Sequence, residues 1–227
     1  MPRGSMNRLG LIPAAGEASR WNGTMKELLP IGEEGSLLSR TIAVMERGAA
    51  RPTMIVTSPR KATSIFQHLA GRHEGIGYVL QSDKSRDVWG AIRESFAYNP
   101  AWTLYAMPDT YVPLDAFYRK MTSDFMLGVF RTDKAERFGV INALGTIDDK
   151  PERLAGTKQW AWGVLAWSRR VVDFWKAQDY QIESHTDAFN QAIQKFGCES
   201  FKLDYYYDIS NWSDYEELIT NVLPLHG

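Results

Sequence analysis

Two patterns of apolar residues alternate along the chain from Leu9 to about Phe130. Short runs of consecutive apolar residues are typical of buried strands, whereas apolar residues three or four positions apart are typical of amphipathic helices. In chain order, the patterns predict strands at 9–13, 53–57, 77–81 and 102–107, and helices at 36–47, 64–69 and 88–98. Ser36 precedes the first helix and is a suitable N-cap.

Strands that alternate with helices imply crossover connections and therefore a parallel sheet with helices on both faces. No low-complexity linker and no internal repeat interrupts this alternation. The predicted fold class is α/β, a single Rossmann-like domain with three α/β/α layers. Ligands of such sheets bind beyond the carboxyl ends of the strands, so the loops that follow the strands are where a site is expected.

Composition narrows the class of protein. The 227 residues are 44% hydrophobic, which is enough for one substantial core. Residues 1–5, MPRGS, have no apolar core and resemble a tag remnant rather than a signal peptide, so the domain is predicted over 6–227. The single cysteine, Cys198, excludes an internal disulfide and a Cys-based zinc site and fits a reducing cytoplasm.

Charge and hydropathy exclude some partners. A net charge of −1 argues against nucleic acid, and no apolar run is long enough to span a bilayer. The four histidines are scattered without the spacing of a metal site or a catalytic triad. We therefore expect a cytoplasmic protein that binds neither nucleic acid nor membrane.

The segment 11–31, LIPAAGEASRWNGTMKELLPI, has the composition of a phosphate-binding loop. The predicted strand ends at Pro13 and is followed by the small-residue turn 14–16 and then by Arg20 and Lys26. Small residues let backbone N–H groups approach an anion, while a guanidinium and an ammonium supply positive charge. Similar turns occur in α/β proteins without binding anything, so composition alone leaves both interpretations open.

The order of these residues, AAG-x-x-x-R followed by K-E-L-L-P-I-G, resembles the N-terminal signature of the sugar-1-phosphate nucleotidyltransferases, or nucleoside-diphosphate-sugar pyrophosphorylases. The resemblance implies the nucleotide-diphospho-sugar transferase fold, with a mainly parallel mixed sheet. The phosphate-contacting positions that it implies are Ala14, Ala15, Gly16 and Glu17, with Arg20 and Lys26 as catalytic residues. The chain departs from the family at Ala18, where a second glycine is usual, so its loop is expected to differ in shape.

Two aspartates match the metal-binding positions of this family. Asp109 directly follows the predicted strand 102–107, and Asp208 ends the aromatic run 205–207. Mg²⁺ prefers one or two carboxylates together with phosphate oxygens. The resemblance implies that both aspartates bind Mg²⁺ and that Asp109 is also catalytic, whereas from the residues alone either is equally an ordinary turn residue. A helix is predicted after Asp208, with Ser213 as its N-cap.

The nucleobase is not assigned by the sequence. Gln81 corresponds to a family glutamine that contacts the base edge, and an amide suits this role because it both donates and accepts hydrogen bonds. The small residues usual beneath the base are replaced by Arg86-Asp87-Val88-Trp89-Gly90. Trp89 is either a base-stacking residue or part of the core.

The resemblance divides the chain into a nucleotide-binding half, 6–130, and an acceptor-binding half, 131–227. In the second half, R-F-G-V at 137–140 resembles a segment whose glycine, here Gly139, approaches the sugar. Asp149-Lys150-Pro151 resembles E-K-P, which implies that Asp149 holds a sugar hydroxyl and Lys150 meets the acceptor phosphate.

Two further segments of the second half have more than one interpretation. The three tryptophans of WAWGVLAWS, 160–168, suit a stacking wall for a sugar, a cage for a cationic alcohol such as choline, or ordinary sheet packing. His185-Thr186-Asp187 resembles the family's I-T-D and opens a predicted helix, for which Thr186 or Asp187 is a candidate cap.

The predicted function is that of a Mg²⁺-dependent nucleotidyltransferase that joins a nucleoside triphosphate to a sugar 1-phosphate and releases pyrophosphate. One alternative is a cytidylyltransferase acting on a phosphorylated alcohol such as phosphocholine or an alditol phosphate. The other is a non-catalytic nucleotide-binding homologue, suggested by Ala18, Asp87 and Val164 at positions where the family has small or specific residues. The expected partners are a nucleoside triphosphate and a phosphorylated small molecule, and self-association is left open.

Overall fold

The computed structural model describes residues 7–16, 21, 23–81, 87–116, 121–178 and 181–226. The strands are β1 (Arg8–Ala14), β2 (Thr53–Thr57), β3 (Ile76–Leu80), β4 (Trp102–Ala106), β5 (Thr110–Tyr111), β6 (Phe125–Thr132), β7 (Gly139–Ile141), β8 (Ile147–Asp149), β9 (Gln159–Ser168), β10 (Glu199–Lys202) and β11 (Tyr207–Asp208). The α-helices are α1 (Leu37–Arg47), α2 (Pro59–Leu69), α3 (Val88–Glu94), α4 (Arg169–Gln178), α5 (His185–Phe196), α6 (Trp212–Glu217) and α7 (Leu223–His226). Short 3₁₀ helices are η2 (Lys26–Leu28), η3 (Gly32–Glu34), η4 (Ser95–Tyr98), η5 (Ala135–Arg137) and η6 (Glu152–Leu154), and the π-helix η8 (Leu218–Val222) joins α6 to α7.

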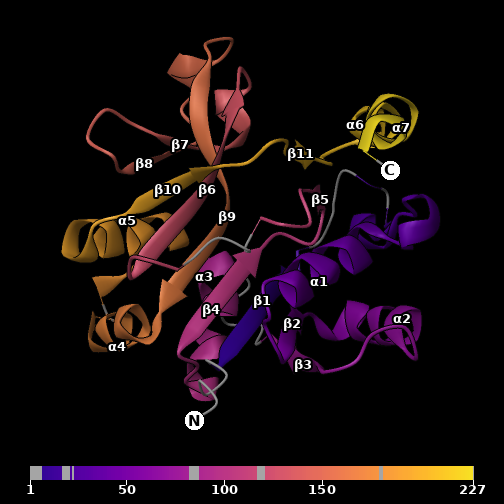
Figure 1. Ribbon diagram of the computed structural model, residues 1–227, viewed down its shortest axis with the longest axis horizontal. Helices are drawn as coiled ribbons and strands as arrows, with labels where there is room; N and C mark the ends of the chain where they lie inside the picture. Colours follow the sequence, from indigo (N-terminus) through magenta and orange to yellow (C-terminus); the bar gives the residue numbers. More distant parts are fainter. Residues whose placement is uncertain are drawn as a thin grey trace.

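Within the described part of the chain, nine strands form one sheet, whose main path runs β10-β6-β9-β4-β1-β2-β3 (Figure 1). β1 is parallel to β2 and β4, β2 is parallel to β3, and β10 is parallel to β6. β9 runs antiparallel to both β4 and β6, and the short β7 pairs with β9 and with β8. This arrangement confirms the predicted mixed, mainly parallel sheet.

Helices cover both faces of the sheet. On one face, Leu38 and Ile42 of α1 and Ile65 of α2 pack against Ile12 and Ile55 of β1 and β2. Apolar residues of α3, α4 and α5 cover the opposite face. The predicted three-layer α/β/α fold is therefore confirmed. Among the described residues, no helix has the length and apolar character needed to cross a membrane.

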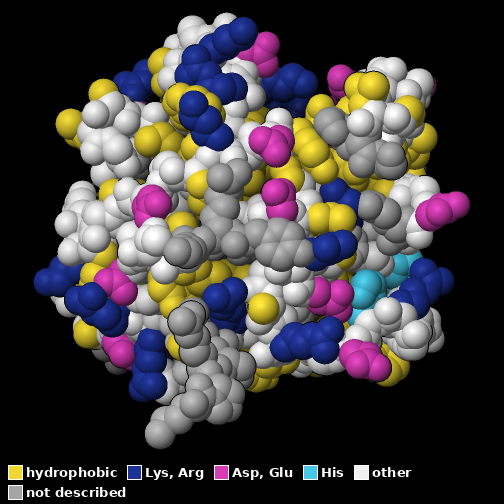
Figure 2. Space-filling model, viewed as in Figure 1, with side chains coloured by type: hydrophobic (Ala, Val, Ile, Leu, Met, Phe, Trp, Pro, Cys, Tyr) yellow, Lys and Arg dark blue, Asp and Glu magenta, His cyan; other side chains and the backbone are white. Residues whose placement is uncertain are grey.

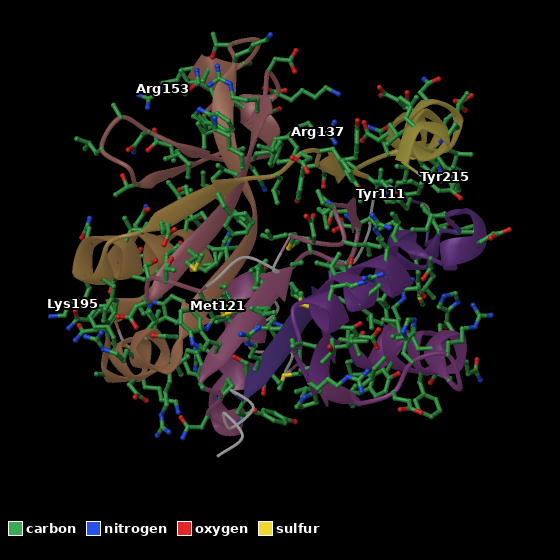
Figure 3. All side chains as sticks on the ribbon, in the orientation of Figure 1. Tyr111, Met121, Arg137, Arg153, Lys195 and Tyr215 are labelled. Carbon is green, nitrogen blue, oxygen red and sulfur yellow. The ribbon has the colours of Figure 1, made fainter. Side chains whose placement is uncertain are left out.

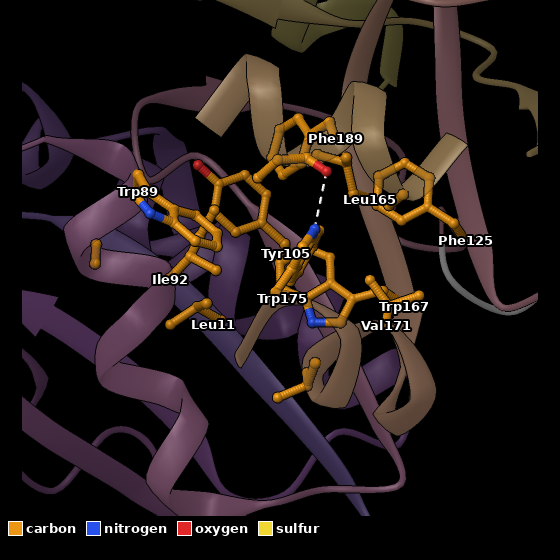
Figure 4. Packing of buried hydrophobic residues seen from close by; sticks show 14 of the residues in the cluster. Leu11, Trp89, Ile92, Tyr105, Phe125, Leu165, Trp167, Val171, Trp175 and Phe189 are labelled. Atoms are coloured by element: carbon orange, nitrogen blue, oxygen red, sulfur yellow. Dashed lines mark hydrogen bonds between the residues drawn. The ribbon is translucent and has the colours of Figure 1, made fainter. Parts of the chain in front are cut away.

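The core beneath α3, α4 and α5 is rich in aromatic rings (Figure 4). The indole N–H of Trp175 donates to the carbonyl of Ala188 at 2.9 Å, which satisfies its polar atom inside this apolar layer. Trp89 is 3% exposed and meets Trp175 edge to face, with ring centroids 5.6 Å apart. Trp89 is thus a core residue, and its ring is not available to stack on a base.

Helix starts follow local capping chemistry. Ser36 caps α1 as predicted, because its hydroxyl accepts from the backbone N–H of Ser39 at 3.2 Å. The N-cap of α6 is Asn211 rather than the predicted Ser213. The Asn211 backbone is extended and its side-chain oxygen accepts from the N–H of Asp214 at 3.0 Å, which places Ser213 inside the helix.

Three other boundaries differ from the sequence-based prediction. β1 continues through Pro13, which is tolerated because β4 pairs with β1 only as far as Leu11. Helix α2 begins at Pro59, well before position 64, since proline is favourable in the first helical turn. Helix α5 is capped by Ser184, which accepts from the N–H of Asp187, and not by Thr186 or Asp187.

The two predicted halves are built on a single sheet. The boundary proposed between 130 and 131 falls inside β6, and β9 of the second half pairs directly with β4 of the first. The division into nucleotide-binding and acceptor-binding halves therefore stays a prediction about ligands and does not correspond to two separate cores.

Candidate active site

A cavity of about 220 Å³ lies beyond the carboxyl end of β4. Its walls come from segments far apart in the sequence, including η2, the turn after β4, β7, the end of β8 and β11. The predicted site residues that line it are Lys26, Asp109, Gly139, Asp149, Lys150 and Asp208. This is the edge of the sheet where ligands of α/β proteins are expected.

Backbone pairing brings the two aspartates together. The short strands β5 and β11 pair antiparallel, with Asp208 opposite Thr110. The N–H of Ile209 also donates to the carbonyl of Asp109 at 3.1 Å. Asp109 and Asp208 are therefore neighbours although 99 positions separate them in the chain.

Asp109 is buried, at 4% exposure, and forms an ion pair with Lys26 through Oδ2. Its other oxygen, Oδ1, is buried and has no hydrogen-bond partner among the described residues. Burial raises the pKa of Asp109 above its ordinary value; the Lys26 ammonium opposes this rise, and the Asp208 carboxylate adds to it. A further cation at Oδ1 would satisfy the unbonded oxygen and offset the charge of both carboxylates.

Asp208 likewise has one oxygen held by protein groups. Oδ2 accepts from Nη2 of Arg137 at 2.8 Å and from the hydroxyl of Ser210. The described residues contain no cluster of three or more His, Cys, Asp or Glu side chains suited to a metal. Each of the two carboxylates nevertheless has an Oδ1 atom to which no described residue donates a hydrogen bond, and such a pair fits Mg²⁺, which completes its coordination with phosphate oxygens and water.

Lys26 is held in place by its neighbours along the chain. It opens η2, and the next residue, Glu27, is 1% exposed and paired with Lys61 of α2 at 2.7 Å. Removal of either partner of a buried ion pair destabilises the protein, because the other charge is then left unpaired in an apolar environment. The Glu27–Lys61 pair therefore fixes η2 against α2 and directs Lys26 to Asp109.

On the other wall of the cavity, Gly139 and Asp149 face each other across the β7–β8 pair. Lys150 follows in the left-handed region, with φ of 46°, and its N–H donates to the carbonyl of Phe138 at 3.0 Å. A lysine rarely adopts this conformation, and such strain concentrates at functional sites. The turn brings the side chain of Lys150 to the cavity wall.

The group packed most closely against Gly139 is the side chain of Trp162, which belongs to the protein itself. A Cβ atom at position 139 would lie 2.2 Å from Nε1 of Trp162. That indole nitrogen is buried and has no hydrogen-bond partner among the described residues. Gly139 thus makes room for the Trp162 ring, and its predicted contact with a sugar stays a prediction.

The three tryptophans of β9 do not form one wall. Trp167 is fully buried in the core, and Trp160 lies beneath Arg131, whose Cζ is 5.0 Å from the ring centroid. Only Trp162 of the three lines the cavity. Sheet packing is therefore the correct interpretation for Trp167, whereas Trp162 is accessible to a ligand.

Several predicted nucleotide-binding residues lie away from this cavity. Gln81 is 5% exposed, and its side-chain amide donates to the carbonyl of Asp87 at 2.7 Å. The turn residues Ala14, Ala15 and Gly16 lie at and just beyond the end of β1 and do not line the cavity. Glu17 and Arg20 lie outside the described residues. The roles predicted for these positions remain predictions.

Some residues of the cavity wall were not predicted as site residues from the sequence: Tyr105, Arg137, Phe138, His185 and Tyr206. Trp162 was considered only as one of the three tryptophans of 160–168. Arg137 and Phe138 precede Gly139 within the R-F-G-V segment, so their position carried a usable signal. Tyr105 and Tyr206 sit in strand-like apolar runs that are indistinguishable from core strands by pattern alone.

The fold and the site define a class of protein. A family model described as Nucleotidyl transferase matches residues 10–223, so the chain belongs to the nucleotidyl transferase family. This match confirms the family predicted from the N-terminal signature and the prediction that the protein is a nucleotidyltransferase. No curated protein matches the chain by sequence.

A solved structure from Bacillus anthracis, provisionally described as a glucose-1-phosphate thymidylyltransferase and determined in complex with sucrose, is similar to this chain. The match covers 95% of each chain with a TM-score of 0.81 and 18% sequence identity. At this identity the similarity shows a shared fold and no more.

Proposed function

We propose that the protein transfers a nucleotidyl group from a nucleoside triphosphate to a sugar 1-phosphate in a Mg²⁺-dependent reaction. The observation that most supports this is the meeting of Lys26, Asp109, Asp208, Asp149 and Lys150 around one cavity. These residues supply both a cation-binding pair of carboxylates and two separate ammonium groups for phosphates.

On the nucleotide side, Asp109 and Asp208 would hold Mg²⁺ through their Oδ1 atoms, to which no described residue donates a hydrogen bond. The ion, when bound, offsets charge on the α-phosphate and makes its phosphorus more electrophilic. Lys26 offsets charge on the nucleotide phosphates, and we propose the same role for Arg20. The similar B. anthracis structure is described as a thymidylyltransferase, which supports this class of donor.

On the acceptor side, Lys150 would bind the phosphate of the acceptor and Asp149 a sugar hydroxyl. A lysine suits this phosphate because its compact charge adapts to a moving oxygen.

The reaction is a displacement at the α-phosphorus. An oxygen of the acceptor phosphate forms the new P–O bond, the bond to the β-phosphate oxygen breaks, and pyrophosphate leaves. The protein supplies alignment and charge neutralisation rather than a covalent intermediate, so positioning of both phosphates carries most of the rate.

This proposal is tested by incubating the protein with each nucleoside triphosphate, Mg²⁺ and a panel of sugar 1-phosphates while measuring pyrophosphate. Asp109→Asn is expected to lower turnover by at least about 100-fold, as for other losses of a group that stabilises transition-state charge. Asp173→Asn is the matched control, because Asp173 lies on α4 and is paired with Arg169 at the surface. Unchanged turnover in Asp109→Asn would show that the metal assignment is wrong.

A phosphorylated alcohol is the second candidate acceptor. The cavity wall includes the aromatic rings of Tyr105, Phe138, Trp162 and Tyr206, which suit a quaternary ammonium group. Phosphocholine and an alditol phosphate therefore belong in the same panel. Pyrophosphate release with these acceptors and none with sugar 1-phosphates would replace the first proposal with the second.

A further inference from the structure

Arg137 joins the cavity to helix α6 through a shared guanidinium group. Its Nη1 donates to Oδ1 of Asp214 at 3.2 Å and its Nη2 donates to Oδ2 of Asp214 at 2.8 Å. The same Nη2 also donates to Oδ2 of Asp208 at 2.8 Å. Arg137 thus contacts the carboxylate of Asp214 at two points and the carboxylate of Asp208 at one, and its Nη2 also donates to the backbone carbonyl of Asp208 at 3.4 Å.

Asp214 is itself fixed by the first turn of α6. Its Oδ2 accepts from the N–H of Ser210 at 3.0 Å, and its own N–H donates to Asn211. Burial opposes ionisation of Asp214, but hydrogen bonds from Arg137 and Ser210 outweigh burial and hold its pKa below the ordinary value. Asp214 therefore presents a permanent carboxylate to Arg137 at neutral pH.

Hydrogen bonds, rather than tight packing, keep Arg137 in this position. Besides the active-site cavity, Arg137 borders a second cavity of about 550 Å³, which Lys134, Lys158 and Glu217 also line. Figure 3 shows Arg137 near β11, between the ends of β6 and β9 and helix α6. Basic side chains gather over those strand ends in Figure 2. With open space beside it, the guanidinium has room to turn if one of its carboxylate partners is lost.

In both carboxylates of the proposed metal site, Oδ2 is the oxygen that other side chains of the protein bind. Asp109 has Oδ2 paired with Lys26 and Oδ1 unbonded. Asp208 has Oδ2 occupied by Arg137 and Ser210, and no hydrogen bond from a described residue reaches its Oδ1. While Arg137 donates to Oδ2 alone, Oδ1 of Asp208 is left for a cation. If Arg137 bonded both carboxylate oxygens, it would leave none.

We propose that Asp214, acting through Arg137, is a positioning residue that keeps Asp208 open to the metal. Without the Asp214 carboxylate, the guanidinium fork has Asp208 as its nearest remaining carboxylate, and planar two-point pairing is the geometry that arginine and a carboxylate favour. Arg137 would then cover both oxygens of Asp208 and compete with the cation. This inference rests on the metal assignment of the proposed function.

The test measures binding of Mn²⁺ alone to the full-length protein, from the loss of the free-ion signal in electron paramagnetic resonance. Asp214→Asn is expected to weaken Mn²⁺ binding about 10-fold, as for other partners of metal ligands. Asp173→Asn, which also removes a carboxylate paired with an arginine, is expected to bind Mn²⁺ as the wild type does. Near-UV circular dichroism verifies that each variant is folded.

A second background separates the proposed route from a general loss of negative charge. Arg137→Met removes the competing fork, so Asp214→Asn in that background should leave Mn²⁺ affinity unchanged. If Asp214 acted only by its charge, the same substitution would weaken binding equally in both backgrounds. Arg137→Met alone is expected to bind Mn²⁺ at least as tightly as Asp214→Asn.

Asp109→Asn distinguishes the two proposals. If the wild type does not bind Mn²⁺, or if Asp109→Asn leaves binding intact, the metal assignment fails and this inference fails with it. If Asp109→Asn abolishes binding but Asp214→Asn binds as tightly as the wild type, only the role of Asp214 is overturned. The same conclusion follows if Asp214→Asn weakens binding in the Arg137→Met background, or if Arg137→Met abolishes it.

Discussion

His185 is a titratable side chain in the wall of the candidate active-site cavity. It opens α5 and packs edge to face against Trp162 and Phe189. Burial lowers the pKa of His185; nearby Asp149 opposes this effect and Lys150 adds to it. The imidazole is therefore neutral near pH 7 and is available as a hydrogen-bonding group rather than a charge.

This lowered pKa predicts acid sensitivity of the fold. The unfolded histidine, with a pKa of about 6.5, takes up a proton that the folded one resists, so stability contributed by His185 is present above that pH and lost on acidification. The free energy of unfolding in urea should fall from pH 7.5 to pH 5.5, and by less in His185→Gln. His68 and His73, whose pKa values burial also lowers, contribute equally to both proteins. Equal losses in both proteins would contradict the prediction.

A β-bulge in β9 shifts by one residue the alternation of its side chains between the two faces of the sheet. Val164 pairs with Gly128 but Trp162 pairs with Val129, so Gly163 is the extra residue. Trp162 and Trp167 are an odd number of positions apart and would face opposite sides of a regular strand. Because of the bulge, both contact Tyr105, at centroid distances of 6.3 and 5.7 Å.

The bulge makes Gly163 sensitive to substitution. A Cβ atom there would lie 2.5 Å from the ring of Tyr206, two residues before Asp208. Gly163→Ala is expected to destabilise the protein by about 1–3 kcal/mol through overpacking and to reduce turnover by displacing Tyr206. Gly77→Ala in β3 is the matched control, since a Cβ there meets nothing within 4 Å. Urea unfolding and pyrophosphate release measure the two effects, and equal stability of both variants would show that Tyr206 adjusts without strain.

The C-terminal segment packs against residues from the first part of the chain. Ile209, Leu218 and Val222 share a buried cluster with Trp21 and Leu37. The indole N–H of Trp21 donates to the carbonyl of Ser210 at 3.1 Å. The segment that carries Asp208 is thus packed on the segment that carries Lys26, so both ends of the chain are needed to form the cavity.

A shared sheet and this packing predict one cooperative unfolding transition. The described residues of the two predicted halves are not separated by an interface, because β6 spans the boundary between 130 and 131 and β9 of the second half pairs with β4 of the first. Urea transitions followed by tryptophan fluorescence and by far-UV circular dichroism should therefore coincide. Two separate midpoints would instead show that the halves are independent folding units.

The sequence predicted the layers well and the site in part. Strand and helix order followed from local apolar patterns, and β2, α1 and β3 lie within a residue or so of their predicted bounds. Lys26, Asp109 and Asp208 were identified from motifs, and the structure brings them to one cavity. The R-F-G-V segment and the three tryptophans drew attention to the stretches that contain Arg137 and Trp162, but the contacts that these two side chains make are with residues distant in the chain, which no local pattern encodes.

Apolar periodicity, the motif at 14–26 and the turn after β4 determined the class of fold and the family, because each depends on neighbours within one element or one turn. The tertiary structure decided that Oδ1 of Asp109 has no hydrogen-bond partner among the described residues and that Trp162 is the tryptophan of β9 that reaches the cavity. Those outcomes depend on long-range pairing, such as β5 with β11, and on a one-residue bulge that reverses the facing of a strand. The segment from Leu11 to Ile31 and the two aspartates could thus be singled out as candidates from the sequence, whereas only the folded chain shows that Lys26, Asp109 and Asp208 line one cavity.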